Sequence, residues 1–232
     1  MITKTLLVVS AFLLFSPVTK ANKTEYSKYL TIAGLEQSEI VDLGVGKMGN
    51  LDKFPIVAPK FYMFSGFQDS PIGDIVNIGK LVWDIITYNK AVANMQTDMA
   101  TALPKGVSDW SAMLGWMSES KAYRIAYKNK LGSNVVDFTY RVLFTHSGSF
   151  NGKGKYLTAI TIIPANLTVL WGFQFNAKAS VPTVLNVGTL EDPVAAARMF
   201  LRWGVKSVLS ANEITKTYTV QGDGVFADTS SK

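Results

Sequence analysis

The chain contains no cysteine and only one histidine among its 232 residues. Without cysteine it forms neither disulfide bonds nor thiolate metal sites, so its stability depends on a buried core. A single histidine leaves too few nitrogen ligands for a typical zinc or iron centre, and no aspartate-rich loop has the spacing that calcium binding requires. The sequence therefore predicts no metal and no other cofactor.

Long apolar runs are also missing, apart from one near the start that covers Leu6 to Phe15. This run is much shorter than the ~20 residues of a membrane-spanning helix. It follows Lys4 and ends before Pro17, which is the pattern of a secretory signal peptide. We therefore expect residues 1–21 to be a signal peptide cleaved before Asn22, with a retained interfacial anchor as the alternative.

An exported chain without cysteine suits a bacterial envelope, so we expect a periplasmic or extracellular protein. Removing residues 1–21 takes away two lysines and lowers the formal charge from +6 to +4. This mild positive charge, with no nucleic-acid-binding motif, predicts no nucleic-acid partner. The rest of the chain predicts a single β-rich domain over residues 22–221 and a flexible tail over residues 222–232.

One segment in the first half of the chain has helical periodicity. Ile75, Ile78 and Ile85 fall on one face of a helix, and Asp74 suits its N-cap position. We therefore expect a helix over residues 74–89, although Gly79 and the β-branched residues weaken this prediction. Short strands are expected near residues 40–43, 54–64 and 91–97.

Three consecutive β-hairpins between Lys121 and Lys178 are the clearest feature of the chain. Apolar and polar residues alternate on each strand, as in a sheet with one buried face. The turns are expected at Gly132–Ser133, Asn151–Gly152 and Pro164–Asn166, and Asn-Gly is a favoured pair for a two-residue hairpin.

The expected register gathers the aromatic residues of these hairpins on one face. It places Tyr123 opposite Val142 and Arg124 opposite Arg141 across the first turn. Across the second turn, Val142 lies opposite Thr161. The predicted core face consists of Phe138, Tyr140, Val142, Phe144, Leu157, Ile163, Leu167, Val169, Trp171, Phe173 and Phe175.

Residues 195–209 fit either a helix or a strand. Pro193 followed by three alanines is typical of a helix start, whereas the apolar residues from Met199 to Val205 alternate strictly. The strand explains more positions and pairs with the next segment across Ala211–Asn212. The predicted fold class is therefore α+β, with a long antiparallel meander of about six long strands, plus short N-terminal strands, packed on one helix near residues 74–89.

Basic residues gather on the polar faces of two predicted strands. They are Arg124, Lys128 and Arg141 on the first hairpin, and Arg198, Arg202 and Lys206 on the later strand. Directly opposed like charges are destabilising unless a partner offsets them. Such a face suits anionic lipid, lipopolysaccharide or an acidic envelope protein. The alternative is an ordinary charged face with acidic partners such as Asp137 and Glu119.

Two loops carry side chains that suit binding or catalysis. Trp110 and Trp116 would stack on sugars or enter a membrane interface, unless they only cover the end of a sheet. His146 precedes Ser147 at a strand end, as a Ser–His–acid site would require. No nucleophile elbow surrounds any serine, so the sequence assigns no catalytic residue.

Three functions are consistent with these features. The favoured one is an exported, non-enzymatic binding or scaffold domain for an apolar or anionic ligand or an envelope protein, with peripheral membrane contact. A small outer-membrane β-barrel is the first alternative, because exported chains with long alternating strands and tight turns form such barrels. A secreted hydrolase that uses carboxylates or His146 is the second.

Overall fold

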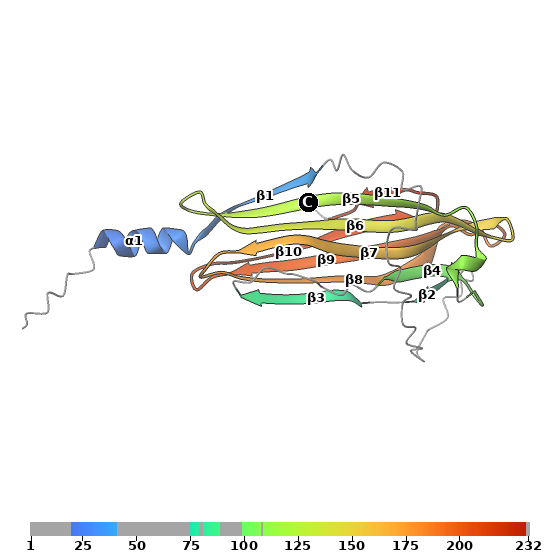
Figure 1. Cartoon of the computed structure of the whole chain (residues 1–232), viewed down its shortest axis with the longest axis horizontal. Coiled ribbons are helices and arrows are strands. Elements are labelled where there is room, and N and C mark those ends of the chain that lie inside the picture. The colour runs from blue at the N-terminus through green and yellow to red at the C-terminus, as the bar shows by residue number, and fades with distance from the viewer. Residues whose placement is uncertain (1–19, 41–74, 79–80, 89–98, 108, 231–232) are drawn as a thin grey trace, which may run out of the picture.

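The computed structural model describes residues 20–40, 75–78, 81–88, 99–107 and 109–230 (Figure 1). In chain order the elements are α1 (Lys20–Tyr29), β1 (Ile32–Ile40), β2 (Ile75–Ile78), β3 (Leu81–Tyr88), β4 (Ala100–Pro104), a 3₁₀ turn (Trp110–Ala112), β5 (Met117–Asn129), β6 (Asn134–Phe150), β7 (Lys153–Val169), β8 (Gln174–Asn186), β9 (Ala195–Lys206), β10 (Ala211–Gln221) and β11 (Phe226–Asp228). The strands expected at residues 54–64 and 91–97 lie outside the described residues.

The strands form two antiparallel sheets. The first has six strands in the order β1-β5-β6-β7-β4-β2, and the second has five in the order β11-β10-β9-β8-β3. Their apolar faces share one buried cluster, as in a β-sandwich. The β-rich, antiparallel character predicted from the sequence is thus confirmed, but the meander is divided between two sheets.

The third predicted turn, at Pro164–Asn166, is wrong, and the division between the sheets falls a few residues later. Strand β7 continues through Pro164–Asn166 to Val169, and the chain turns at Leu170–Phe173 before β8 enters the second sheet. The β6–β7 register shifts beside Pro164, and proline is tolerated in a strand at such an irregularity. Trp171, expected in the core, is consequently at a turn and 62% exposed.

The first two predicted hairpins are present, with altered registers. Tyr123 pairs with Tyr140 rather than Val142, because the chain reverses one residue earlier around Asn129, whose Oδ1 accepts from the Ser133 N–H at 3.0 Å. The Asn151–Gly152 turn has positive φ at both residues, as predicted. Irregularities between β6 and β7 then place Val142 opposite Ile162.

The helix expected over residues 74–89 is wrong. Ile75–Ile78 form β2 and Leu81–Tyr88 form β3, and these strands belong to different sheets. The β-branched residues of this segment favour strands, and pairing with β4 and β8 gives the backbone its hydrogen-bond partners. The described helix is α1 instead, which extends from one end of the sandwich (Figure 1).

Strand β9 confirms the choice of a strand over a helix for residues 195–209. It pairs with β10, but the turn lies at Ser207–Ser210 rather than Ala211–Asn212. Trp203 therefore lies opposite Ile214 instead of Val220. Within the segment expected to be a tail, Phe226–Asp228 form β11 along β10.

Large aromatic side chains on the inner faces bond to one another through their polar tips. Tyr140 Oη of the first sheet and Tyr218 Oη of the second lie 2.7 Å apart. Trp203 Nε1 donates to Tyr127 Oη at 3.0 Å, and this hydroxyl donates to Asn212 Oδ1 at 2.7 Å. Buried hydroxyl and indole groups cost free energy when unpaired, so these contacts stabilise one packing of the two sheets.

Burial raises the pKa values of three core tyrosines, Tyr123, Tyr140 and Tyr218, above that of an ordinary tyrosine. The folded protein keeps these protons at pH values where the unfolded chain loses them. Their stabilising contribution is therefore complete below about pH 10 and is lost as the pH rises above it. We predict that the urea midpoint falls steeply above about pH 10.

The variant Tyr123→Phe tests whether the tyrosine hydroxyls cause this alkaline decline. It removes an ionisable hydroxyl for which the structure describes no hydrogen bond, so little else should change. We expect it to fold and to lose part of the alkaline decline in the urea midpoint. An identical decline in wild type and variant would contradict a contribution from Tyr123.

Candidate functional site

The basic residues predicted on the first hairpin lie on the outer face of the first sheet, beside acidic residues. Arg124 binds the Asp137 carboxylate, and this hydrogen bond, together with the negative charge, raises the pKa of Arg124. Lys128 pairs with Glu36 of β1. The expected Arg124–Arg141 opposition is wrong, since Arg124 lies opposite Thr139 in the β5–β6 ladder.

Strand β1 is the reason why this face is less basic than expected. It lies along β5 and supplies Glu36 to Lys128 and Glu39 to Lys121, with 3.6 Å between Lys121 Nζ and Glu39 Oε1. Sequence reasoning missed both glutamates, because the polar segment that forms β1 was not predicted to be a strand beside the first hairpin.

The outer face of the second sheet is more basic. Arg198, Arg202 and Lys206 follow one another along this face of β9, about 13 Å apart at ~3.3 Å per residue, and all are exposed. Lys178 of β8 lies directly opposite Arg202, while Arg202 also pairs with Glu213 of β10. Arg198 and Lys206 have no acidic partner among the described residues.

Sequence reasoning missed Lys178 because β8 was assigned to a single meander with β6 and β7. Its outward position was already indicated by the alternation of Lys178 with buried Ala177 and Ala179. On its other side, the register partner of Lys178 is Asp84 of β3. The two predicted basic groups lie on different sheets and do not form one surface.

The predicted tryptophan pair is built into the end of the sandwich. Trp116 Nε1 donates to the Trp110 carbonyl at 3.1 Å, and both side chains are half-buried. The Trp116 ring lies over Gly148, where an added Cβ would be 2.2 Å from the ring. Leu114 of this loop is 76% exposed, more than either tryptophan, so a role of the tryptophans in sugar or lipid binding stays a prediction.

His146 lies between a serine and a carboxylate. Its Nδ1 is 2.9 Å from Ser147 Oγ, and its Nε2 is 3.5 Å from Glu119 Oε1. Ser147 has a φ of 65°, which is uncommon for a residue other than glycine. Glu119 therefore supplies the acidic group of this trio, whereas Asp137 binds Arg124.

This trio differs from a hydrolytic triad in two respects. The Ser147 N–H donates to the Gly222 carbonyl at 2.8 Å, so it is not free to stabilise an oxyanion. His146 is 4% exposed, and Gly224 packs against its ring. The arrangement holds the end of β6 against the β10–β11 turn and suits a structural role better than catalysis.

Comparison with protein-family models, curated proteins and solved structures finds no match. The described residues contain no cluster of three or more metal-ligating side chains. The described part of the chain has no helix long and apolar enough to span a membrane. Fold and surface together define a two-sheet β-sandwich with a basic outer face on its second sheet.

The contact of Gly224 with His146 leads to a stability prediction. Gly224 has a φ of +90°, and an added Cβ would lie 2.8 Å from His146 Cε1. We expect Gly224→Ala to reduce the free energy of unfolding through both backbone strain and this clash. Urea unfolding measures the loss.

Gly132→Ala is the matched control, because Gly132 has a φ of +82° and no atom within 4 Å of the added Cβ. The Gly224 variant should lose at least about 1 kcal/mol more than the Gly132 variant. In a His146→Ala background this excess should shrink. If Gly224→Ala and Gly132→Ala reduce the free energy of unfolding equally, with or without His146→Ala, the proposed contact is excluded.

Proposed function

We propose that the protein is an exported, non-enzymatic binding domain that holds an anionic envelope partner on the outer face of its second sheet. The observation that carries the proposal is the row of Arg198, Arg202 and Lys206 along β9, with Lys178 directly opposite Arg202. The signal-peptide pattern of residues 1–21 supports export.

Opposed cations on neighbouring strands repel each other, and the acidic register partner Asp84 lies on the other side of Lys178. Glu213 offsets the charge of Arg202, which leaves Arg198 and Lys206 as the exposed cations available to a ligand. Because they project from a paired strand, their spacing is set before binding, which lowers the ordering cost of association.

The separation of these cations favours an extended partner with several negative groups. Arg198 and Lys206 are eight residues apart on β9, which corresponds to about 26 Å at ~3.3 Å per residue. A single small anion would reach one of them, whereas the phosphorylated sugars of lipopolysaccharide would reach several. Lipopolysaccharide is therefore the partner that we propose for this face.

Charge reversal tests the binding face. We predict that Arg198→Glu combined with Lys206→Glu weakens binding of fluorescent lipopolysaccharide at least about tenfold, since each basic residue near an anionic surface contributes about 1 kcal/mol. The interaction of wild type should also weaken as salt increases.

The matched control reverses two exposed lysines elsewhere, Lys105 and Lys153, and changes the net charge equally. It should retain most of the affinity. Equal losses in the two double variants would show that net charge alone governs binding, and no binding by wild type would refute the proposed partner.

The location of the native protein tests export separately. After expression of the full chain in a Gram-negative host, we predict release by osmotic shock and a mature N-terminus at Asn22, because signal peptidase removes the segment before it. A cytosolic product that begins at Met1 would contradict export.

A further inference from the structure

Three turns and the end of α1 meet at one end of the sandwich, which we call the loop end. The turns are Lys130–Ser133 between β5 and β6, Leu170–Phe173 between β7 and β8, and Ser207–Ser210 between β9 and β10. Figure 1 shows these connections beside α1, at the end from which the helix extends.

Hydrogen bonds connect each turn to the segment at the end of α1. The Lys130 N–H donates to the Thr31 carbonyl at 3.0 Å, and Tyr29 Oη donates to the Trp171 carbonyl at 2.9 Å. Ser207 Oγ donates to the Leu30 carbonyl, and Leu30 itself is buried. These hydrogen bonds therefore hold the three turns of the loop end against the segment at the end of α1.

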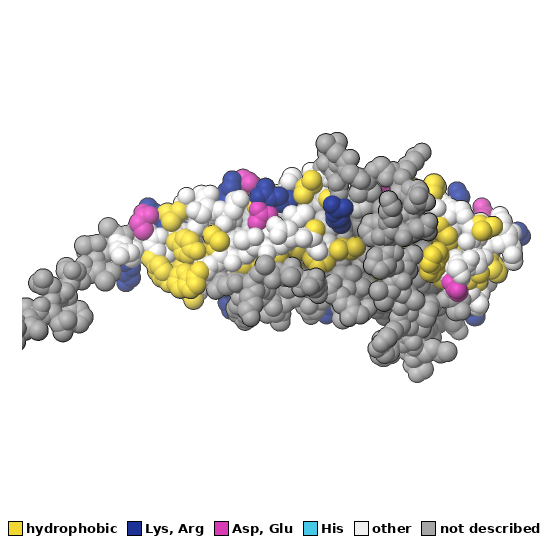
Figure 2. Space-filling model, viewed as in Figure 1, with side chains coloured by type: hydrophobic (Ala, Val, Ile, Leu, Met, Phe, Trp, Pro, Cys, Tyr) yellow, Lys and Arg dark blue, Asp and Glu magenta, His cyan; other side chains and the backbone are white. Residues whose placement is uncertain are grey.

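The tips of this surface are apolar and exposed. Val208 is 81% exposed, Trp171 62% and Leu209 54%. Leu131 and Tyr26 add further exposed apolar area, and the Tyr26 and Trp171 ring centroids are 6.3 Å apart. Figure 2 shows hydrophobic side chains gathered at this end, next to charged side chains near α1.

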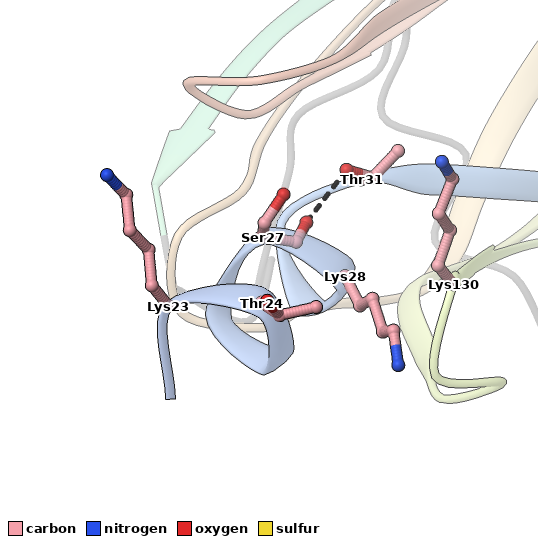
Figure 3. Close-up of a pocket in the computed structure, with 6 residues that line it drawn as sticks. All are labelled: Lys23, Thr24, Ser27, Lys28, Thr31 and Lys130. Atoms are coloured by element: carbon pink, nitrogen blue, oxygen red, sulfur yellow. Dashed lines mark hydrogen bonds between the residues drawn. The ribbon is translucent and has the colours of Figure 1, made fainter. Parts of the chain in front are cut away.

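Lysines lie next to these apolar tips. Lys23, Lys28 and Lys130 line a shallow hollow of about 420 Å³, together with hydroxyl side chains of α1 and the following residues (Figure 3). Glu25 pairs with Lys28 across 3.0 Å, and Lys23 and Lys130 have no acidic partner among the described residues. Lys206 lies at the base of the β9–β10 turn and is also exposed.

We propose that the loop end docks on the surface of an anionic lipid bilayer. Trp171, Val208 and Leu209 enter the interfacial region, and the neighbouring lysines contact lipid phosphates. Tryptophan favours the membrane–water interface, while aliphatic tips gain free energy when they leave water. Basic residues next to them add attraction to anionic headgroups.

A bilayer explains this combination better than a protein partner does. Apolar side chains project from three separate turns, whereas a protein interface would more often offer a packed patch with charges depleted at its core.

This membrane contact goes beyond the proposed function, because the apolar tips that it needs lie outside the basic row of β9, although Lys206 adjoins both surfaces. Arg198 lies near the start of β9, while the loop end follows the last residue of that strand. Arg198→Glu should therefore weaken lipopolysaccharide binding without changing the binding of phospholipid vesicles. Failure of one proposal is distinguishable from failure of the other.

The test is co-sedimentation of the mature protein with vesicles of phosphatidylglycerol and phosphatidylcholine. We expect Val208→Asp combined with Leu209→Asp to weaken binding on the order of tenfold or more, through loss of apolar insertion and addition of negative charge. Vesicles of phosphatidylcholine alone should bind wild type much more weakly, since they lack the negative charge that attracts the lysines.

The matched control is Val187→Asp combined with Leu190→Asp. It changes the same two residue types in the β8–β9 connection, at the opposite end of β9, where both side chains are exposed. This control should bind vesicles within about twofold of wild type, because the added charge remains far from the lipid. Equal losses in the two double variants, or no binding by wild type, would overturn the proposal.

Fluorescence quenching by lipids brominated in the acyl chains gives a second readout that does not depend on the aspartate variants. Wild type should be quenched on binding, and Trp171→Phe should lose most of that quenching while it still sediments with the vesicles. Quenching that survives in Trp171→Phe would place another tryptophan at the lipid and overturn the docking geometry. Binding only to a protein partner, with none to lipid, would overturn it as well.

Discussion

The passage of the chain from the first sheet to the second determines the arrangement of the whole molecule. Strand β7 ends at Val169, the chain turns at Leu170–Phe173, and β8 begins in the other sheet. Gly172 at this turn has a φ of +85°, and an added Cβ would lie 2.7 Å from the Leu30 side chain. The crossing therefore needs both a left-handed backbone and close contact with the segment after α1.

The crossing also separates the two basic groups and creates the inner layer. It places β6 and β10 in facing sheets, so that Tyr140 and Tyr218 bond through their hydroxyls in the buried interior. The same division turns Lys178, Arg198 and Arg202 to the outside of the second sheet. Binding is therefore proposed for outer faces and turn tips, while the inner faces supply stability.

Alternation along the strands predicted most of the buried residues, although Ile163 is only half-buried, and it did not determine their partners. Phe138, Tyr140 and Phe144 are fully buried as expected. A shift of two residues leaves every side chain on the same face, so the alternation fits both the expected and the observed partner of Tyr123. The helix prediction failed because Ile75, Ile78 and Ile85 match a helical period while their β-branched side chains favour strands.

The candidate sites were likewise predicted well where only the alternation within a strand mattered, and poorly where the position of a turn mattered. The sequence identified Arg198, Arg202 and Lys206 as one face, since that depends only on alternation within β9. It assigned Trp171 to the core because Pro164–Asn166 resembled a turn. The most direct test of the two-sheet arrangement is acrylamide quenching of tryptophan fluorescence in wild type and Trp171→Phe. Trp171 is the most exposed tryptophan among those whose side chains the structure describes. The structure therefore predicts that the variant loses an accessible component, and unchanged quenching would contradict an exposed Trp171 and the crossing that places it there.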